Sequence, residues 1–262
     1  MTQRDKAERF RALHEGDPFI IPNPWDAGSA KVLEALGFKA LATTSSGYAF
    51  TLGRLDGAVT LHEMIEHVRT LDRSTNLPIS VDLENGYGSD PDAAASAVVA
   101  AAEAGAVGGS IEDFDPDDGI YDLDHAVERV AAACEAAHGL EFAFLLTARA
   151  ENHIRGNPDL EDTIARLEAF ERAGADVLYA PGLRTTEEIR AVSGATSKPL
   201  NVLAHAGLSM EDIIRAGGQR VSVGGSLTWV TVGAMATAAE EMRDRGDFAS
   251  LKIRLPLEDW LG

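Results

Sequence analysis

The sequence predicts one (β/α)8, or TIM, barrel domain over residues 1–262. Three observations support this prediction. A short apolar run followed by an amphipathic helical stretch recurs eight times, the runs do not alternate between apolar and polar residues, and a glycine stands just before four of them. Strands without alternation are typical of a parallel sheet that is covered on both faces. A (β/α)8 barrel typically has about 250 residues, which fits the length of this chain.

The strands are expected where the apolar runs lie, and each has four or five residues. They span 19–23, 40–44, 78–82, 108–112, 143–147, 176–179, 200–203 and 220–223. Helices are expected to start at polar residues, such as Asp26 and Ser209, whose side chains accept hydrogen bonds from the first helical N–H groups. They cover 3–15, 26–37, 61–74, 91–105, 124–138, 159–173, two segments that start at Thr185 and Ser209, and 227–245, with loops at 45–57 and 113–121.

The charge balance excludes some classes of partner. Lys and Arg total 23 while Asp and Glu total 42, so the formal net charge is −19. Nucleic acid and anionic membrane would repel such a surface. The N-terminal stretch has no apolar signal-peptide centre, and no run approaches the roughly 18 apolar residues of a membrane helix. We therefore expect a cytoplasmic protein that binds neither nucleic acid nor membrane.

Two further segments have a structural interpretation. The one cysteine, Cys134, lies in an apolar helical pattern, so we expect a buried core residue and no intrachain disulfide. The apolar tail 251–262 packs either on a neighbouring subunit or on the barrel's own surface.

Charged residues follow the third, fourth and fifth predicted strands. They are Asp82 with Glu84, then Glu112, then Arg149. Barrel enzymes carry their chemistry at these C-terminal strand ends. Residues two apart in a strand point to the same face, so Asp82 and Glu84 are both expected to face the mouth. Carboxylate oxygens from adjacent strands suit Mg²⁺, with Mn²⁺ as an alternative.

The polar residues near the other strand ends allow two interpretations each. Arg149 either holds a carboxylate or phosphonate at two points or forms a structural ion pair, for instance with Glu151. Ser45, Ser46 and Gly47 either present hydroxyl and N–H donors to a substrate carboxylate or form a plain loop. His205 is either an acid, base or ligand contact or a loop histidine. The remaining histidines are scattered and show no zinc spacing.

Seven short segments, in order along nearly the whole chain, complete the pattern. They are 23–27, 44–47, 53–57, 82–88, 110–113, 147–149 and 220–225. Together they resemble the isocitrate lyase/phosphoenolpyruvate mutase superfamily. The resemblance implies a Mg²⁺-dependent barrel that acts on small 2-oxo or 2-hydroxy carboxylates, breaking or forming C–C or P–C bonds through an enolate held by the metal. It also implies a homotetramer, often with the last helix swapped between subunits.

The resemblance further implies roles for individual residues. Asp82 would bind the metal directly, while Glu84 and Glu112 would do so directly or through water. Asp56 would lie near the metal's water shell. Taken together, the residues predicted for substrate binding are Trp25, Ser45, Ser46, Gly47, Asp82, Arg149 and Asn201, and those predicted for catalysis are Asp56, Arg149 and His205.

The sequence departs from the superfamily pattern at two places. Glu84 stands where aspartate is usual. The loop 113–121 has no Lys, Cys or His, whereas the lyases and the mutase carry such residues there. A classical isocitrate or methylisocitrate lyase and a true mutase are therefore disfavoured. We expect a less typical member, such as an oxaloacetate decarboxylase, that cleaves a C–C bond.

Alternatives remain at the level of the sequence. The chain could be a phosphonopyruvate-type enzyme that cleaves a P–C bond, or a binding protein for 2-oxo acids without turnover. The general acid is also open, with His205, Tyr48, Tyr87 and Tyr121 as candidates.

Overall fold

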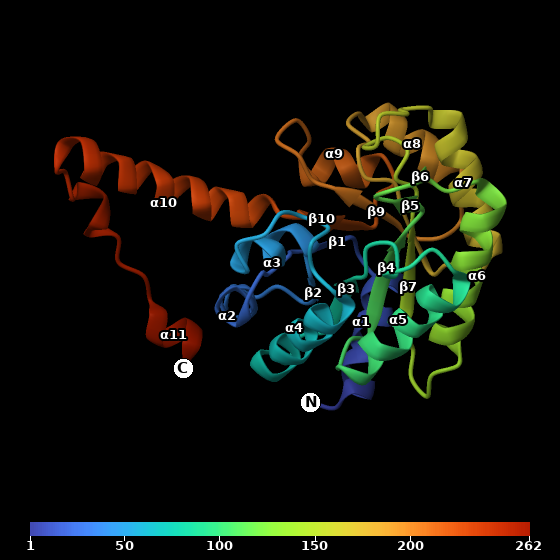
Figure 1. Ribbon diagram of the computed structural model, residues 1–262, viewed down its shortest axis with the longest axis horizontal. Coiled ribbons are helices and arrows are strands. Elements are labelled where there is room, and N and C mark those ends of the chain that lie inside the picture. Colours follow the sequence, from blue (N-terminus) through green and yellow to red (C-terminus); the bar gives the residue numbers. More distant parts are fainter.

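Eight parallel strands form one sheet that curls into a barrel in the computed structural model, which describes all 262 residues (Figure 1). The sheet order is β1-β10-β9-β8-β7-β4-β3-β2. The end strands meet where the Ala42 N–H donates to the Pro22 carbonyl at 3.1 Å. This confirms the predicted barrel. The strands are β1 Phe19–Ile21, β2 Leu41–Ala42, β3 Ile79–Asp82, β4 Gly108–Glu112, β7 Leu145–Arg149, β8 Val177–Tyr179, β9 Leu200–Leu203 and β10 Arg220–Ser222.

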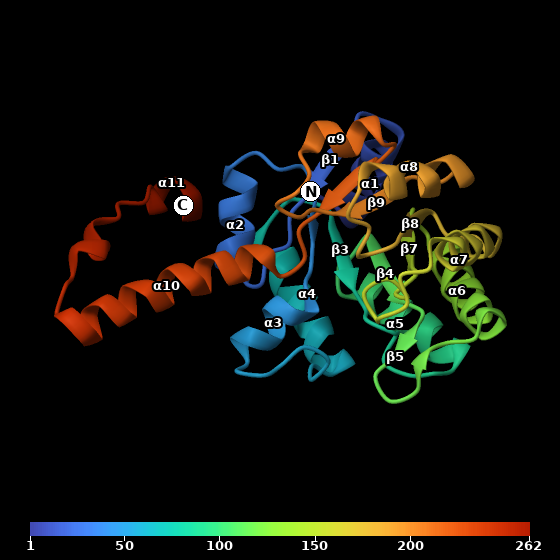
Figure 2. The same ribbon diagram turned by 90° about the horizontal axis from the view of Figure 1, so that it is seen from above.

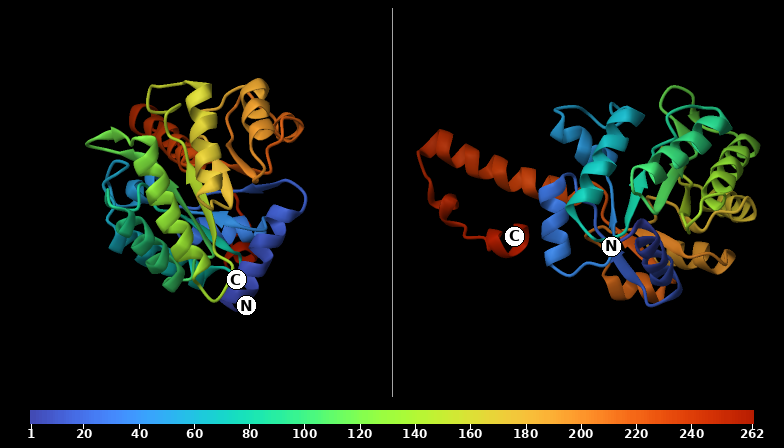
Figure 3. Two further views of the ribbon diagram at one scale, coloured as in Figure 1. Left: turned by 90° about the vertical axis from the view of Figure 1, so that its right-hand side faces the viewer. Right: turned by 90° about the horizontal axis from the view of Figure 1, so that it is seen from below.

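Helices surround the barrel on its outer face (Figure 2). They are α2 Ala27–Ala35, α3 Ser45–Thr51, α4 Leu61–Ser74, α5 Pro91–Glu103, α6 Leu123–His138, α7 Leu160–Arg172, α8 Thr186–Ala195 and α9 Met210–Arg215. A further helix, α1 Gln3–Glu15, covers the N-terminal strand ends, where Phe10 packs with Phe19 and Val107 (Figure 3). None of the helices combines the length and apolar character needed to span a bilayer.

Glycines lie at the turns between a helix and the next strand, as the sequence predicts. Gly105 follows α5 with φ +111°, and Gly217 follows α9 with φ +97°. Only glycine adopts this backbone region without strain. A Cβ atom at Gly105 would also lie 2.5 Å from Cγ of Asp72. Both positions therefore require glycine for the chain to reverse into the next strand.

Three segments differ from the sequence-based prediction. The expected loop 45–57 begins with helix α3, because the Thr44 hydroxyl accepts the Gly47 N–H at 3.3 Å and caps a first turn. The expected loop 113–121 contains a hairpin of β5 Phe114–Asp115 and β6 Gly119–Ile120. The fifth barrel strand lies two residues later than predicted. Its pairing with β4 aligns Glu112 with Arg149, so the ladder extends past the apolar run that the sequence pattern marks.

The C-terminal region leaves the barrel. Helix α10 Ser226–Arg245 projects away from the other helices (Figures 1 and 2), and of its side chains only Thr228 is buried. The chain then turns through a 3-10 segment, Ala249–Lys252, and ends in α11 Leu257–Leu261. Helix α11 returns to α2 of the same chain, where Lys31 Nζ donates to the Leu261 carbonyl at 3.0 Å. The C-terminal region thus contacts its own barrel at both of its ends, where Trp229 at the start of α10 packs on Phe50 of α3 and where α11 meets α2.

Cys134 confirms the interpretation of the apolar pattern in α6. Its side chain is buried within the main core cluster. Burial raises the pKa of the thiol to about 12, so the group stays a neutral thiol rather than a nucleophilic thiolate at ordinary pH.

Candidate active site

The C-terminal strand ends enclose a cavity of about 230 Å³. An adjoining cavity of about 290 Å³ lies between the segments that follow β2, β3, β4 and β7. Every barrel strand contributes to the wall of the first cavity, through Ile21, Ala42, Ser80 to Asp82, Ser110, Glu112, Arg149, Tyr179, Asn201, Leu203, Arg220 and Ser222. The mouth of the barrel is therefore a polar site built by distant parts of the chain, as the fold predicts.

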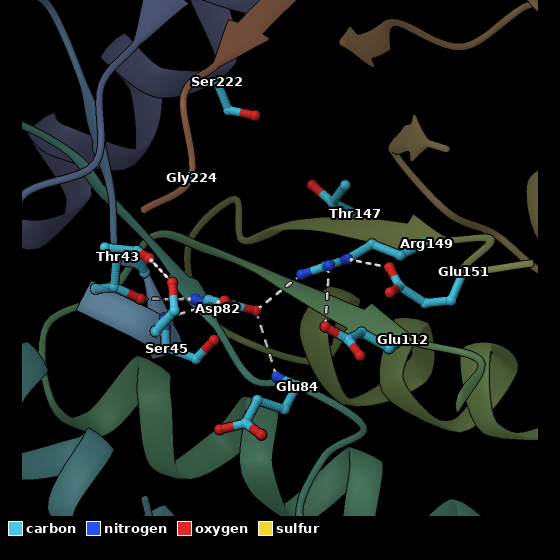
Figure 4. A network of polar contacts seen from close by, with 12 residues as sticks. Thr43, Ser45, Asp82, Glu84, Glu112, Thr147, Arg149, Glu151, Ser222 and Gly224 are labelled. Atoms are coloured by element: carbon cyan, nitrogen blue, oxygen red, sulfur yellow. Dashed lines mark hydrogen bonds and ion pairs between the residues drawn. The ribbon is translucent and has the colours of Figure 1, made fainter. Parts of the chain in front are cut away.

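Arg149 is the centre of the polar network in this cavity (Figure 4). Its guanidinium lies 3.0 Å from Asp82, 3.0 Å from Glu112 and 2.8 Å from Glu151. The Arg149 side chain is only 12% exposed. Burial works against the charged form, yet the carboxylates hold the pKa of Arg149 well above its ordinary value. The predicted ion pair with Glu151 is present, and two strand-end acids share the same cation.

Glu84 takes a different position from the one that strand geometry predicts. Strand β3 ends at Asp82, and Glu84 has a left-handed backbone with φ +48°. The rule that alternate strand residues share a face therefore does not apply to this pair. The Glu84 carboxylate borders the adjoining cavity together with Glu112, while Asp82 borders the first cavity. The two acids thus approach the mouth from adjoining spaces rather than from one strand face.

The Glu84 carboxylate is also electrostatically unusual. Its Oε1 atom is buried and has no hydrogen-bond partner. Burial, followed by the negative charges of Asp82 and Asp56, raises the pKa of Glu84 to about 7. Burial likewise raises the pKa of Glu112, with Glu151 and Asp82 adding to the effect and Arg149 opposing it. Negative charge is therefore in excess at this end of the barrel.

The carboxylate oxygens are of the chemical type that a hard divalent cation prefers. Asp82, Glu84 and Glu112 offer only oxygen ligands, and an unpartnered buried oxygen is one of them. As the side chains stand, no three His, Cys, Asp or Glu residues lie close enough to hold a metal ion. Arg149 reaches both Asp82 and Glu112, so the guanidinium occupies the space between these two acids.

The segment after β2 contributes a helix start rather than a plain loop. The Ser45 N–H donates to the Asp82 carboxylate at 3.2 Å, and Ser45 and Ser46 both border the cavity. Gly47 lies beneath them, where a Cβ atom would be 2.6 Å from Thr44 and 3.2 Å from Cβ of Trp25. Of the residues implied in substrate binding here, the structure brings the serines to the cavity wall but not Gly47 or Trp25.

Asp56 and Asn201 do border the cavity. Asp56 lies on an exposed loop between the two cavities. The Asn201 amide is fixed at both ends, since its nitrogen donates to the Ser222 hydroxyl at 3.0 Å and its oxygen accepts from Arg220 Nε at 2.7 Å.

His205 is not part of the cavity wall. Its Nε2 atom lies 3.1 Å from the Arg184 carbonyl, and its Nδ1 atom accepts the Gly207 N–H at 3.0 Å. Both ring nitrogens therefore serve to hold the loop that follows β9.

The tyrosines that the sequence offers as acids also lie elsewhere. Tyr48 stacks on His67 with ring centroids 3.9 Å apart, and Tyr121 donates to Asp115 at 3.1 Å. Neither they nor Tyr87 border the first cavity, whereas Tyr179 does. Tyr179 lies within a buried strand, and the apolar pattern of that strand predicts a core position for an aromatic residue.

Two arginines at the cavity are also absent from the sequence-based set of site residues. Arg155 lies on the loop after β7, 3.4 Å from Glu112 and with its guanidinium 3.8 Å from the ring centre of Phe114. Arg220 is the first residue of β10. The sequence does contain a sign of this role, because Arg220 is a charged residue at the start of an otherwise apolar strand. A charged side chain inside a barrel needs polar partners there.

Comparison with known proteins identifies the family. The sequence model of the family described as phosphoenolpyruvate phosphomutase matches residues 10–243. The chain belongs to the phosphoenolpyruvate mutase family. An uncharacterised protein of Mycobacterium tuberculosis H37Rv is 31% identical over 236 residues, with 88% of this chain and 87% of that protein covered. The oxaloacetate decarboxylase of Bradyrhizobium sp. ORS 278 is 30% identical over 233 residues, with 85% and 79% covered.

A solved structure extends the likeness to three dimensions. A crystal structure of a Burkholderia cenocepacia J2315 protein, provisionally assigned as a lyase/mutase, superposes with a TM-score of 0.96 at 49% identity. The match covers 98% of this chain and 96% of that one. The predicted membership of the superfamily and the predicted barrel are therefore both confirmed for this phosphoenolpyruvate mutase family member.

Proposed function

We propose that this phosphoenolpyruvate mutase family member is a Mg²⁺-dependent lyase, decarboxylase or hydrolase. It cleaves a C–C bond in a small 2-oxo or 2-hydroxy carboxylate. The observation that carries the proposal is the pair of adjoining cavities whose walls hold Asp82, Glu84 and Glu112, with Arg149 paired to Asp82 and Glu112. The similarity to an oxaloacetate decarboxylase supports the class of reaction.

The metal in this proposal is Mg²⁺, held by Asp82, Glu84 and Glu112, with Asp56 nearby. Mn²⁺ has the same preference for oxygen ligands. When bound, the cation stabilises negative charge that develops on a substrate oxygen. The number of carboxylates supports this assignment, because Asp82, Glu112 and Glu151 all pair with Arg149, and Arg155 pairs with only two of them.

The chain's own residues supply the remaining functions. The hydroxyls of Ser45 and Ser46 bind a substrate carboxylate at the start of α3. Arg149 contributes positive charge opposite them. Tyr179 is the tyrosine on the cavity wall, and burial raises its pKa to about 12, so its hydroxyl keeps its proton at neutral pH. This makes Tyr179 the candidate proton donor in place of His205.

The proposal is tested by a substrate panel. The purified protein is mixed with Mg²⁺ and oxaloacetate, methylisocitrate, isocitrate, dimethylmalate or phosphonopyruvate, and the products are followed by NMR with an EDTA control. EDTA-sensitive release of pyruvate, oxalate or glyoxylate identifies the bond that breaks. Ligand binding without any turnover would instead indicate a binding protein for 2-oxo acids.

Asp82→Ala provides the matched test of the metal site. We expect turnover to fall by more than about a hundredfold, since even outer partners of metal ligands contribute roughly 10- to 100-fold. Asp92→Ala, which removes an exposed carboxylate from α5, is the control and should keep full activity. Full metal-dependent activity in Asp82→Ala, with an unchanged circular dichroism spectrum, would refute the metal assignment.

Arg155 favours phosphonate chemistry as a second candidate. A P–C bond enzyme needs more cationic groups near the mouth, and Arg155 borders both cavities. The acidic hairpin of β5 and β6 argues against this reading. Release of phosphate from phosphonopyruvate in the same substrate panel would show that the protein cleaves a P–C bond.

We also propose a homo-oligomer, a dimer or tetramer, as the working state. The support is α10, which projects from the barrel with Trp229 47%, Val230 68% and Met235 60% exposed. Apolar side chains exposed along one helix are typical of an interaction surface. The proposed function further includes a small carboxylate as the ligand and a cytoplasmic location for the protein.

A further inference from the structure

Arg220 is a buried cation without an acidic partner. The residue is 5% exposed, and none of its side-chain contacts is with an acid. Its contacts are neutral: Nε donates to the Asn201 side-chain oxygen at 2.7 Å, and a terminal nitrogen donates to the Thr147 hydroxyl at 3.0 Å. The other terminal nitrogen lies 3.3 Å from Nε2 of His14. A buried charge is costly unless it is paired, so this arrangement calls for a counter-charge.

His14 does not supply that counter-charge. Its Nδ1 atom lies 2.8 Å from the Phe10 carbonyl, which assigns the proton to Nδ1 and leaves Nε2 to accept from Arg220. Burial, and then the charge of Arg220, lower the pKa of His14 to about 3, so the ring is neutral at ordinary pH. Burial also lowers the pKa of Arg220 to about 10, which leaves the guanidinium charged. The cation therefore lies uncompensated above α1.

The uncompensated charge borders the candidate active site. Arg220, Asn201, Ser222 and Tyr179 all line the 230 Å³ cavity. The acids on the wall of this cavity are Asp56, Asp82 and Glu112, which follow or end strands at the mouth. Arg220 instead opens its strand, so it lies on the floor. Figure 4 shows Thr147 and Ser222 on the other side of Arg149 from Glu84 and Glu112.

The donors of Arg220 are not all used. A guanidinium has five N–H groups, and the three contacts above use one on each nitrogen. One N–H on each terminal nitrogen is left without an acceptor in the chain. Two neighbouring donors on a desolvated cation match the two oxygens of a carboxylate.

We propose that Arg220 binds a second anionic group of the substrate, the distal carboxylate of a 2-oxo or 2-hydroxy dicarboxylate. This inference rests on the proposed function, because it places the reacting end of the same molecule at Asp82 and Arg149. The dicarboxylate supplies the missing counter-charge, while a monocarboxylate leaves Arg220 uncompensated. Arg220 is thus the residue that selects for two negative charges.

The test compares L-malate with L-lactate, which share the 2-hydroxy acid end and differ in the distal carboxylate. Dissociation constants are measured by calorimetry in Mg²⁺ for the full-length wild type, Arg220→Met and Arg220→Lys. We expect the wild type to prefer malate, and Arg220→Met to lose about 10- to 100-fold in malate affinity, as expected for a hydrogen bond to a charged group. Lactate affinity should stay within about twofold, because lactate has no distal group.

The controls separate binding from folding. Lys6→Met removes another buried cation, which pairs with Asp72 outside the cavity, and should leave both affinities unchanged. Arg220→Lys keeps the charge without the paired donors and should lie between wild type and Arg220→Met. If Arg220→Met does not fold, a crystal structure of the wild type with malate decides, since the distal carboxylate must lie within hydrogen-bonding distance of Arg220.

Two results would overturn the proposal. One is a wild type that binds malate no more tightly than lactate. The other is a folded Arg220→Met that keeps the full preference for malate, in which case Arg220 only orients Asn201. Both results are read from binding alone, so they are distinguishable from failure of the proposed reaction, which appears as absence of turnover in the substrate panel.

Discussion

At the scale of single residues, the site is governed by the way charges share a small space. Arg149 faces three carboxylates at 3.0 Å or less, while Arg220 faces none. The upper part of the cavity is therefore negative and its floor is positive. This separation of charge orients a ligand, because a bound cation is attracted to the negative upper part and an anionic group to the positive floor.

Tyr179→Phe tests the proton donor at this scale. We expect kcat to fall by about 10²- to 10⁴-fold, which is the usual contribution of a positioned acid, with a much smaller change in KM. The raised pKa of Tyr179, about 12, further predicts no loss of activity from ionisation of this hydroxyl below about pH 11. Both quantities come from steady-state kinetics on the substrate that the panel identifies.

Tyr121→Phe is the matched control, because Tyr121 donates to Asp115 outside the first cavity. Equal kinetic effects in the two variants would count against Tyr179 as the donor.

At the scale of elements, helix α10 differs from the helices that cover the barrel. Helices such as α4 and α7 bury one face, whereas α10 buries only Thr228. A helix of 20 residues that projects without a packed face gains little from tertiary contacts within its own chain. We expect another copy of the chain to cover it.

Val230→Glu with Met235→Glu tests this expectation. Charges on these exposed positions should leave the barrel intact but cost desolvation at an interface, so the complex should dissociate. Light scattering should report a multiple of the 27.8 kDa chain for wild type and the single-chain mass for the variant.

The control for α10 is Glu161→Lys with Glu168→Lys, which changes charge on the outer face of α7. It should keep the wild-type mass. A wild type that is monomeric at all concentrations would contradict the proposed oligomer.

At the scale of the whole molecule, the acid sensitivity of the fold depends on buried histidines. Burial lowers the pKa of His67 to about 4, with the charge of Asp26 opposing the effect, and that of His14 to about 3. Each ring is neutral in the folded protein but takes up a proton in the unfolded chain below about pH 6.5. Their contribution to stability is therefore complete above pH 6.5 and is lost as the pH falls toward the folded-state values.

His67→Phe isolates one of these contributions, since phenylalanine keeps a ring against Tyr48 and does not titrate. Between pH 7 and pH 5, the free energy of unfolding should fall by about 1–2 kcal/mol less in this variant than in wild type. Urea unfolding followed by circular dichroism at pH 5, 6 and 7 measures the difference.

His62→Phe, an exposed position on the same helix, serves as the reference and should keep the wild-type dependence on pH. If His67→Phe also keeps the wild-type pH dependence of the free energy of unfolding, His67 is not the cause of the acid sensitivity.

The sequence by itself determined the barrel, most element boundaries and the ring of acids at the strand ends. These features depend on periodicity and on partners a few residues away. The cap at Ser209 bonds to Asp212 three residues later, and the glycines before the strands are needed by their own backbone angles. The positions of Asp82, Glu112 and Arg149 follow from their place at the ends of neighbouring parallel strands.

Only the tertiary structure decided what these groups contact. Glu84 turns into a second cavity because its backbone is left-handed, and His205 is held in its loop by two local bonds. Arg220 meets Thr147, which is 73 residues away, across the barrel interior. Such contacts join side chains that no pattern along the chain relates, because closing the sheet brings residues from all eight strands around one axis.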